Sequence, residues 1–323
     1  MLVLAKCGDF AVLEDIENRV EYPLLLFREE GSHHAFTDLA FFNNKWYLTF
    51  RKSDKHVRGK DGSILIYSSD NFIQWNNEKE YFVPGVDLRD PDFFVWNDQL
   101  KIKLHGSIYD ADKLVGFREY VSNLSLEGNW GNAQLVEAPH ESWLWKFFTI
   151  ENRLLSLGYN PDISSIPINS VVSLFEIHDQ EAVRLCDLPL TGYHNEGIIR
   201  EINGKSIAVI RNEYGNLFVG EINLENCELT SYNFPMDIKG GMNIAILNSN
   251  SIKIVGRVNQ KTKPSIISVD YSFTDQAIVN IDSIESGGDC GYPGIVHTDS
   301  VTYLSYYSTH YGNAIFLNKL FPK

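Results

Sequence analysis

The sequence has little cysteine and no long apolar run, and both absences limit what kind of protein it encodes. Its four cysteines are scattered along 323 residues at Cys7, Cys186, Cys227 and Cys290. They form neither a small-domain disulfide framework nor a paired zinc-ligand spacing, so we expect reduced, buried thiols. No apolar stretch approaches the roughly 20 residues of a membrane span. This predicts a soluble protein with no membrane partner.

A targeting signal is also missing from the start of the chain. Residues 1–15 lack a basic start, a long apolar stretch and a small-residue cleavage site. We therefore expect a cytoplasmic protein, with a secreted chain that has lost its leader as the alternative.

Basic residues are scarce as well. Lys and Arg number 28 against 42 Asp and Glu, for a formal net charge of -14 at pH 7. Because nucleic acids are bound through clustered Lys and Arg, we expect no nucleic-acid partner. No motif indicates a metal site or a cofactor, and no pattern indicates an oligomeric state.

What the sequence does contain is a repeated hairpin, in which a short turn separates two apolar, β-branched or aromatic runs. The turns are Asn43-Asn44, Asn97-Asp98, Glu151-Asn152, Asn203-Gly204, Ser249-Asn250 and Thr298-Asp299. Their first residues are 54, 54, 52, 46 and 49 positions apart. A period of about 40 to 50 residues is typical of propeller blades.

A second hairpin follows each of the first five, which gives four strands per blade. We therefore predict an all-β fold, a six-bladed β-propeller of four-stranded antiparallel blades that forms a single domain over residues 1–323. The blades are expected at residues 36–86, 87–140, 141–192, 193–239, 240–287 and 288–323. The last blade lacks one strand, and Leu2 to Leu13 is expected to supply it, so that the N- and C-terminal strands close the ring.

Several motifs resemble those of sialidases. Residues 68–75 look like an Asp-box, Ser-x-Asp-x-Gly-x-Thr-Trp, in which Ser68, Asp70 and Trp75 match, and a weaker copy ends at Trp130. Longer stretches that are similar to sialidase-like hydrolases span residues 36–57, 87–94, 193–215 and 288–312. The resemblance implies a propeller-fold glycoside hydrolase.

The resemblance also implies a catalytic site. In this family a Tyr nucleophile is paired with a Glu, an Asp serves as acid and base, and three Arg hold the substrate carboxylate. Tyr292, Glu196 and Arg211 occupy matching positions. A phenol needs a base before it attacks carbon, and a nearby carboxylate supplies one. The family's Arg-Ile-Pro is replaced by Phe36-Thr37-Asp38, which argues against sialic acid as the substrate.

The expected acid and base lies on the loop after the first hairpin, where Asp54 and Asp61 both occur. We prefer Asp54 because His56 and Arg51 lie close to it in the sequence. His310 is expected at the rim of the site.

Equivalent positions of the blades should form rings around the central opening. Eight residues after each turn start, the side chains are large hydrogen-bond donors, namely Arg51, His105, Tyr159, Arg211, Arg257 and Tyr306. Six or seven residues before the turns, the ring comprises Asp90, Trp145, Glu196, Asn243 and Tyr292. The Arg side chains, with Arg89 beside Asp90, match a carboxylate, sulfate or phosphate. We therefore predict an anionic small molecule or oligosaccharide as substrate, with Arg–acid pairing as the alternative and Trp145 as an aromatic platform for a sugar or as core.

Two other functions fit the same residues. Asp38, Asp90 and Glu196 are also typical of the three-carboxylate site of propeller furanosidases and fructosidases, but those folds have five blades and this repeat has six. A non-catalytic propeller that binds a glycan or a protein is the second alternative, because a fold can lose its chemistry and keep its site.

Overall fold

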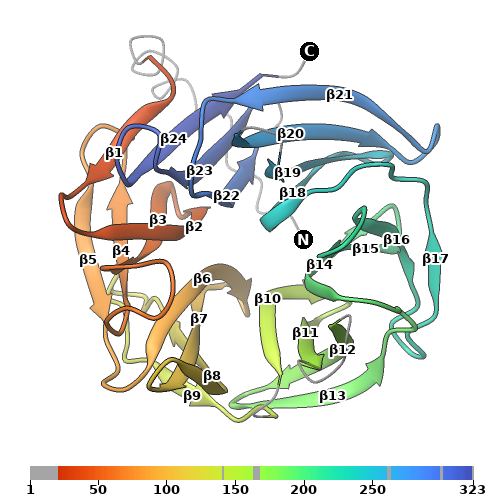
Figure 1. Cartoon of the computed structure of the whole chain (residues 1–323), viewed down its shortest axis with the longest axis horizontal. Coiled ribbons are helices and arrows are strands. Elements are labelled where there is room, and N and C mark those ends of the chain that lie inside the picture. The colour runs from red at the N-terminus through yellow and green to blue at the C-terminus, as the bar shows by residue number, and fades with distance from the viewer. Residues whose placement is uncertain (1–20, 140–141, 163–167, 260–262, 299–300, 322–323) are drawn as a thin grey trace.

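A computed structural model shows the protein as a ring of blades around a central axis (Figure 1). It describes residues 21–139, 142–162, 168–259, 263–298 and 301–321. Within these ranges there are six four-stranded antiparallel sheets and no helix. The predicted six-bladed β-propeller is thus confirmed. No described helix is long and apolar enough to cross a membrane.

The strands of each blade run outward from the axis in chain order. The first three blades comprise β2 (His33–Phe42), β3 (Lys45–Ser53), β4 (Ser63–Ser69) and β5 (Asn76–Tyr81); β6 (Asp87–Trp96), β7 (Gln99–Asp110), β8 (Lys113–Asn123) and β9 (Gln134–Val136); and β10 (Trp143–Ile150), β11 (Arg153–Asp162), β12 (Asn169–His178) and β13 (Glu181–Asp187). The fourth and fifth comprise β14 (His194–Ile202), β15 (Lys205–Asn212), β16 (Phe218–Ile222) and β17 (Leu229–Ser231); and β18 (Lys239–Asn248), β19 (Ser251–Asn259), β20 (Pro264–Ser272) and β21 (Ala277–Ile284).

The sixth blade joins the two ends of the described chain. It comprises β22 (Cys290–His297), β23 (Thr302–Ser308), β24 (Ala314–Leu320) and β1 (Leu24–Arg28). Leu24 pairs with Leu317 and Arg28 with Ala314, so an N-terminal strand closes the ring as expected. The closing strand is Leu24–Arg28, whereas Leu2 to Leu13, which the sequence suggested, lies outside the described residues.

Turn chemistry is the local reason for the inner hairpins. In the described residues φ is positive at both central positions of Asn43-Asn44, Asn97-Asp98, Glu151-Asn152 and Asn203-Gly204. This is the type I′ geometry that matches the twist of the flanking strands, and Asn, Asp and Gly tolerate it best.

The core lies between adjacent blades. Trp46 of β3 is 1% exposed, and its ring packs on Phe72 of its own blade and on Tyr303 of the sixth. Phe72 belongs to the turn between β4 and β5, where the Asp-box resemblance lies. There the Trp75 indole donates a hydrogen bond to the Phe72 carbonyl over 2.9 Å. The turn thus anchors the outer strands to the core, far from the axis.

One cysteine expectation was wrong. Cys186 of β13 and Cys227, in the connection between β16 and β17, form a disulfide between the third and fourth blades. The two cysteines are 41 residues apart in the sequence, and no local sequence pattern predicts that these two positions of neighbouring blades meet. Cys290 is free and buried, as expected.

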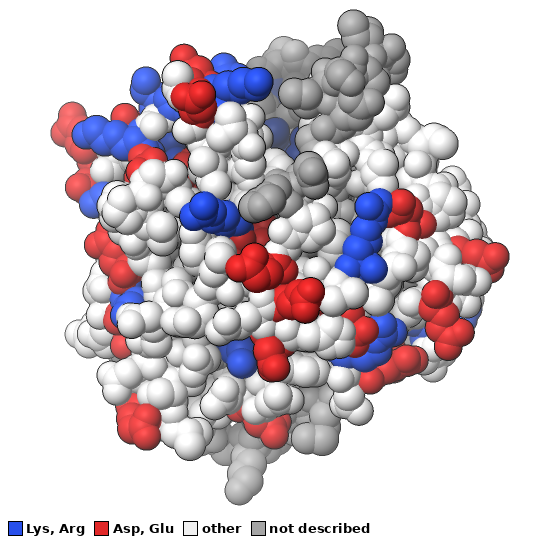
Figure 2. Space-filling model, turned by 90° about the horizontal axis from the view of Figure 1, so that it is seen from below, with Lys and Arg blue, Asp and Glu red and all other residues white. Residues whose placement is uncertain are grey.

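Charged side chains of both signs are interspersed on the side of the molecule shown in Figure 2. Among the described residues on that side, no broad basic area is present.

Candidate functional site

Every inner strand carries a β-bulge at the same height along the axis. Each inner strand pairs regularly with the second strand of its blade except at one point. There, two or three residues of the inner strand lie opposite a single residue of the second strand. The extra residues are Phe36-Thr37, Asp90-Pro91, Trp145-Lys146, Asn195-Glu196, Gly240 to Met242 and Tyr292-Pro293. A bulge interrupts the alternation of side chains and re-aims one of them. Proline fits there, because a bulged residue needs no ladder N–H.

The backbone has a positive φ at the bulges of four consecutive blades, and three of these residues are not glycine. φ is positive at Gly241 of the fifth, Tyr292 of the sixth, Phe36 of the first and Asp90 of the second, with values of 60°, 48°, 56° and 46°. A non-glycine residue in this region costs on the order of 1–3 kcal/mol, and such residues cluster at functional sites.

The bulges line a small cavity on the axis. It measures about 20 Å³ and is bounded by Phe36, Asp90, Trp145, Gly241 and Tyr292, among others. That volume is about enough for one water molecule. Of the ring that the sequence predicted before the turns, Asp90, Trp145 and Tyr292 line this cavity, and Gly241 takes the place expected for Asn243. Glu196 lies at the equivalent bulge of the fourth blade but does not line the cavity. Asn243 instead donates a hydrogen bond to the Pro293 carbonyl over 3.0 Å and ties the fifth blade to the sixth.

Tyr292 is the tyrosine of this ring. Its ring packs edge-on against Phe36 at 4.7 Å between centroids and lies 5.9 Å from Trp145. Burial raises the pKa of the phenol, and the charges of Glu196 and Asp90 raise it further, against the opposing effect of Arg211 and Arg89. The tyrosine therefore stays protonated until a base takes its proton.

Glu196 is paired with Arg211. Arg211 Nη1 lies 2.6 and 2.8 Å from the two Glu196 oxygens, and Nη2 donates to Glu213. Burial lowers the pKa of Arg211, but Glu196, Tyr292 and Glu213 raise it more. Glu196 and Arg211 both act electrostatically on Tyr292, the third residue matched to the sialidase motif.

Asp90 is a buried carboxylate at the same centre. Burial raises its pKa, Arg89 and Lys103 lower it, and Glu196 raises it. Its Oδ1 has no hydrogen-bond partner among the described residues, and Arg89 Nε lies 3.5 Å from Oδ2.

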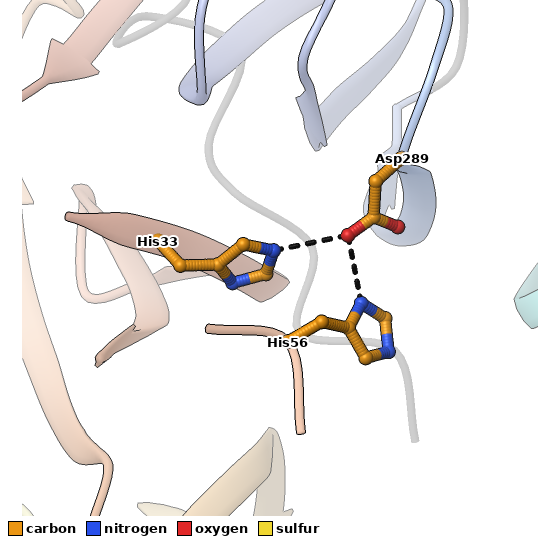
Figure 3. Close-up of side chains that lie close together, drawn as sticks. All are labelled: His33, His56 and Asp289. Atoms are coloured by element: carbon orange, nitrogen blue, oxygen red, sulfur yellow. Dashed lines mark hydrogen bonds and ion pairs between the residues drawn. The ribbon is translucent and has the colours of Figure 1, made fainter. Parts of the chain in front are cut away.

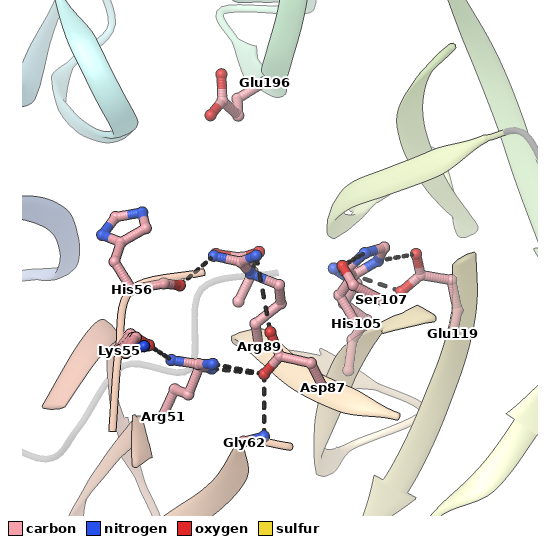
Figure 4. A network of polar contacts seen from close by, with 12 residues as sticks. Arg51, Lys55, His56, Gly62, Asp87, Arg89, His105, Ser107, Glu119 and Glu196 are labelled. Carbon is pink, nitrogen blue, oxygen red and sulfur yellow. Dashed lines mark hydrogen bonds and ion pairs between the residues drawn. The ribbon is translucent and has the colours of Figure 1, made fainter. Parts of the chain in front are cut away.

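Arg51 and Arg89 are engaged with acids and with one loop (Figure 4). Arg51 is fully buried and binds Asp87 Oδ1 through Nε at 2.9 Å and Nη2 at 2.6 Å. Its Nη1 donates to the Lys55 carbonyl over 2.8 Å, and Arg89 donates to the His56 carbonyl over 3.2 Å. Acid pairing, the alternative in the sequence interpretation, holds for both, and the two guanidinium groups fix the loop that carries His56.

The ring expected eight residues after the turns does not face the opening as a whole. Besides Arg51, His105 is fully buried, hydrogen-bonds Glu119 over 2.7 Å and stacks on Trp143 at 4.0 Å. Tyr306 is buried and donates to the Glu285 carbonyl over 2.9 Å. Because Arg51 and Tyr306 are fully buried and hydrogen-bonded within the protein, we do not keep them as substrate contacts.

Two predicted carboxylates lie elsewhere. Asp54 is on the loop surface, where it accepts hydrogen bonds from the Lys60 amide over 2.7 Å and from the Ser53 hydroxyl over 3.3 Å. Asp38 accepts the Phe93 amide over 2.7 Å and lies 3.5 Å from Lys146 Nζ. Asp38 is therefore engaged with Lys146 in a buried ion pair, and the three-carboxylate site that the sequence suggested as an alternative is not formed.

Three side chains that the sequence did not group together meet beside the opening (Figure 3). His33 Nε2 and His56 Nδ1 lie 2.9 and 2.8 Å from the same Asp289 oxygen. Their ligand atoms lie within 4.8 Å of one another, the closest to a metal-binding set among the described residues. However, hydrogen bonds already hold both imidazoles, and Arg257 Nη1 lies 4.0 Å from Asp289 Oδ1. This positive charge disfavours a cation, and we assign no metal here.

His310 lies farther out on the sixth blade. Its Nδ1 is 2.7 Å from the Ser308 hydroxyl and its Nε2 is 3.9 Å from Glu285. These contacts do not join it to Tyr292 or Glu196.

Several buried polar atoms around the ring lack a hydrogen-bond partner in the described chain. The donors are the Nε atoms of Arg89, Arg211 and Arg257 and the indole nitrogen of Trp145, and the acceptor is Asp90 Oδ1. Buried polar groups are normally satisfied, so water or a ligand would be needed to complete their hydrogen bonds. Donors outnumber the acceptor, which favours an acceptor-rich ligand.

No family model and no curated protein matches this sequence. Among solved structures, the Hadza microbial sialidase Hz136 is similar at TM-score 0.70 and 11% identity, over 89% of this chain and 66% of that protein. The phage phi92 endosialidase is similar at TM-score 0.68 and 8% identity, over 93% and 69% of the two chains. Trypanosoma rangeli sialidase, as a covalent intermediate with 2,3-difluorosialic acid, is similar at TM-score 0.67 and 10% identity, over 92% and 58%.

The chain thus spans less than two thirds of the Hadza microbial and trypanosomal sialidases. Identities this low show the architecture alone, and the chain has the six-bladed β-propeller fold that these sialidases share.

Proposed function

We propose that this protein is a sialidase-like glycoside hydrolase that acts on a carboxylated sugar or glycan, with Tyr292 as nucleophile and Glu196 as its base. The observation that carries the proposal is the convergence at one bulged ring of a strained tyrosine with two carboxylates and two guanidinium groups.

The chemistry follows from the charges around Tyr292. The phenol is neutral at physiological pH, because even the ordinary pKa of tyrosine is about 10 and burial raises that of Tyr292, so it does not repel an anionic sugar. As Tyr292 attacks the anomeric carbon, its proton passes to Glu196. Arg211, which bonds both oxygens of Glu196, orients that carboxylate.

The excess of unpartnered donors supports a carboxylated substrate. Arg89, Arg211 and Arg257 each keep one buried N–H without a partner in the described residues, although each also lies within 4.0 Å of an acidic side chain. A sugar carboxylate can accept several of these hydrogen bonds, whereas a neutral sugar offers hydroxyl groups that also need acceptors.

The test is a panel of chromogenic glycosides that includes sialosides and uronides, with wild type, Tyr292→Phe and the control Tyr271→Phe. Tyr271 is also buried, and its hydroxyl donates to the Asn233 carbonyl far from the ring. We expect Tyr292→Phe to lose at least about 10³-fold in kcat and Tyr271→Phe to retain activity. A 2-fluoro glycoside of the substrate should label Tyr292 in peptide mass spectra.

Full activity of Tyr292→Phe would exclude the tyrosine nucleophile. No turnover across the panel, with glycan binding still detectable by calorimetry, would identify a binding propeller instead.

A further inference from the structure

Asp289 precedes β22 and gathers side chains from several parts of the ring. It accepts hydrogen bonds from His33 of β2, from His56 on the loop after β3 and, over 2.8 Å, from the hydroxyl of Tyr307 in β23. Its own amide donates to the Thr309 hydroxyl over 2.9 Å. Burial raises the pKa of Asp289, but the hydrogen bonds from the two histidines and Tyr307 hold it well below its usual range.

An ionised carboxylate accepts hydrogen bonds and donates none. The imidazole nitrogens that face Asp289 must therefore carry hydrogen, namely Nε2 of His33 and Nδ1 of His56. In the neutral form of His56 the lone pair is then on Nε2. Figure 3 shows this second nitrogen directed away from Asp289.

His56 lies next to the nucleophile's own neighbours. Its ring meets Phe36 edge-on at 5.0 Å between centroids, and Phe36 in turn contacts Tyr292. The charge of His56 acts on Asp90. Figure 4 shows His56 beside Arg89, with Glu196 apart from both on another blade.

The position of His56 is held from both sides, and its side chain is still accessible. The guanidinium groups of Arg51 and Arg89 fix the carbonyls of Lys55 and His56, while Asp289 holds the imidazole. The side chain keeps 34% of its surface exposed, against 12% for His33. An acid–base group requires neighbours that hold its side chain in a fixed orientation, as these hydrogen bonds do.

We propose that His56, oriented by Asp289, is the general acid and base of this site, an inference that rests on the proposed function. Protonated His56 gives its Nε2 proton to the glycosidic oxygen as the bond from that oxygen to the anomeric carbon breaks. Tyr292 Oη bonds to the same carbon, and its proton passes to Glu196.

In the second half of the reaction, in which water hydrolyses the glycosyl-tyrosine intermediate, neutral His56 takes a proton from water as the water oxygen bonds to the anomeric carbon. The bond between that carbon and Tyr292 breaks with its electron pair on the tyrosine oxygen, which recovers its proton from Glu196. His56 thus takes the role that the sequence interpretation gave to Asp54, whose carboxylate is bound to its own loop.

The test uses the leaving group. A poor leaving group, such as an alkoxide, needs protonation by an acid, whereas a good one, such as dinitrophenolate, needs it much less. We therefore expect kcat/KM of His56→Gln to fall about 10²–10⁴-fold on alkyl glycosides. On dinitrophenyl glycosides kcat/KM should change little. Asp289→Asn should show the same pattern, as a positioning residue. On dinitrophenyl glycosides kcat of His56→Gln should fall although kcat/KM does not, because water still needs the base to attack the intermediate. Added azide, which needs no base, should raise this kcat. The control His178→Gln replaces an exposed histidine on the outer part of the third blade.

Equal losses on both leaving groups would mean a structural role and would overturn the inference, as would a leaving-group-dependent loss in Asp54→Asn. Activity abolished by EDTA and restored by Zn²⁺ would also overturn it, in favour of a metal site. An active wild type with an unaffected His56→Gln refutes this inference alone, whereas an inactive wild type refutes the proposed function as well. Nitrogen-15 NMR should show the Nδ1–H tautomer of His56, and the Nε2–H tautomer would contradict the pairing.

Discussion

Gly241 is the position where one added methyl group should disable the site. A Cβ placed there would lie 2.2, 2.5 and 2.8 Å from Cδ1, Cε1 and Cγ of Tyr292. Ordinary contact begins at 3.4 Å, so in Gly241→Ala the tyrosine ring must move by about 3.4 - 2.2 = 1.2 Å. A misplacement of about 1 Å costs on the order of 100-fold in rate when the group takes part in the reaction.

A matched control separates this collision from backbone strain. Gly204, in a hairpin turn on the opposite side of its blade from the bulge, has φ +71° against +60° at Gly241, and a Cβ there meets no described atom within 4 Å. Alanine at a positive φ costs about 1–2 kcal/mol of folding free energy at either site. Because the collision with Tyr292 adds about 1–3 kcal/mol of overpacking, we expect Gly241→Ala to lose more stability by thermal melting than Gly204→Ala, which pays for backbone strain only. We expect folded Gly241→Ala alone to lose about 100-fold in kcat/KM on the best glycoside of the panel. If folded Gly241→Ala retained wild-type activity, the position of Tyr292 against Gly241 would not matter for the reaction.

Two further predictions concern stability. Replacing Cys186 and Cys227 together by alanine opens a 41-residue loop and should lower the free energy of unfolding by about 4 kcal/mol; equal urea midpoints for the variant and the oxidised wild type would contradict the disulfide. Burial and the charge of Asp92 raise the pKa of Asp38 from 3.8 to about 7, although Lys146 opposes them. Since the folded protein holds this proton more tightly than the unfolded chain, the contribution is complete below about pH 4 and is lost as pH rises through 7. Unfolding free energies measured from pH 4 to 8 should therefore fall more for wild type than for Asp38→Asn, and parallel curves would refute the assignment.

The sequence alone determined the architecture. Each hairpin depends on turn residues that tolerate positive φ, as at Asn43-Asn44 and Asn203-Gly204, and on the apolar runs beside them. These signals are local and repeat at nearly constant spacing, so both the number of blades and the height of Glu196 and Tyr292 along the axis follow from counting.

Contacts between blades had to come from the tertiary structure. Asp289 lies 256 residues from His33 and 233 from His56, and no local pattern predicts that they meet. The same holds for the disulfide between the third and fourth blades.

Counting also failed where the strands depart from regular pairing. The bulges place Gly241, and not Asn243, against Tyr292, and the regular strands behind them bury Arg51 and Tyr306. The physical reason is that one extra residue reverses the faces to which the following side chains point. The sequence thus determined which residues lie at the level of the ring, and the bulges and the packing between blades decided which of them face its centre.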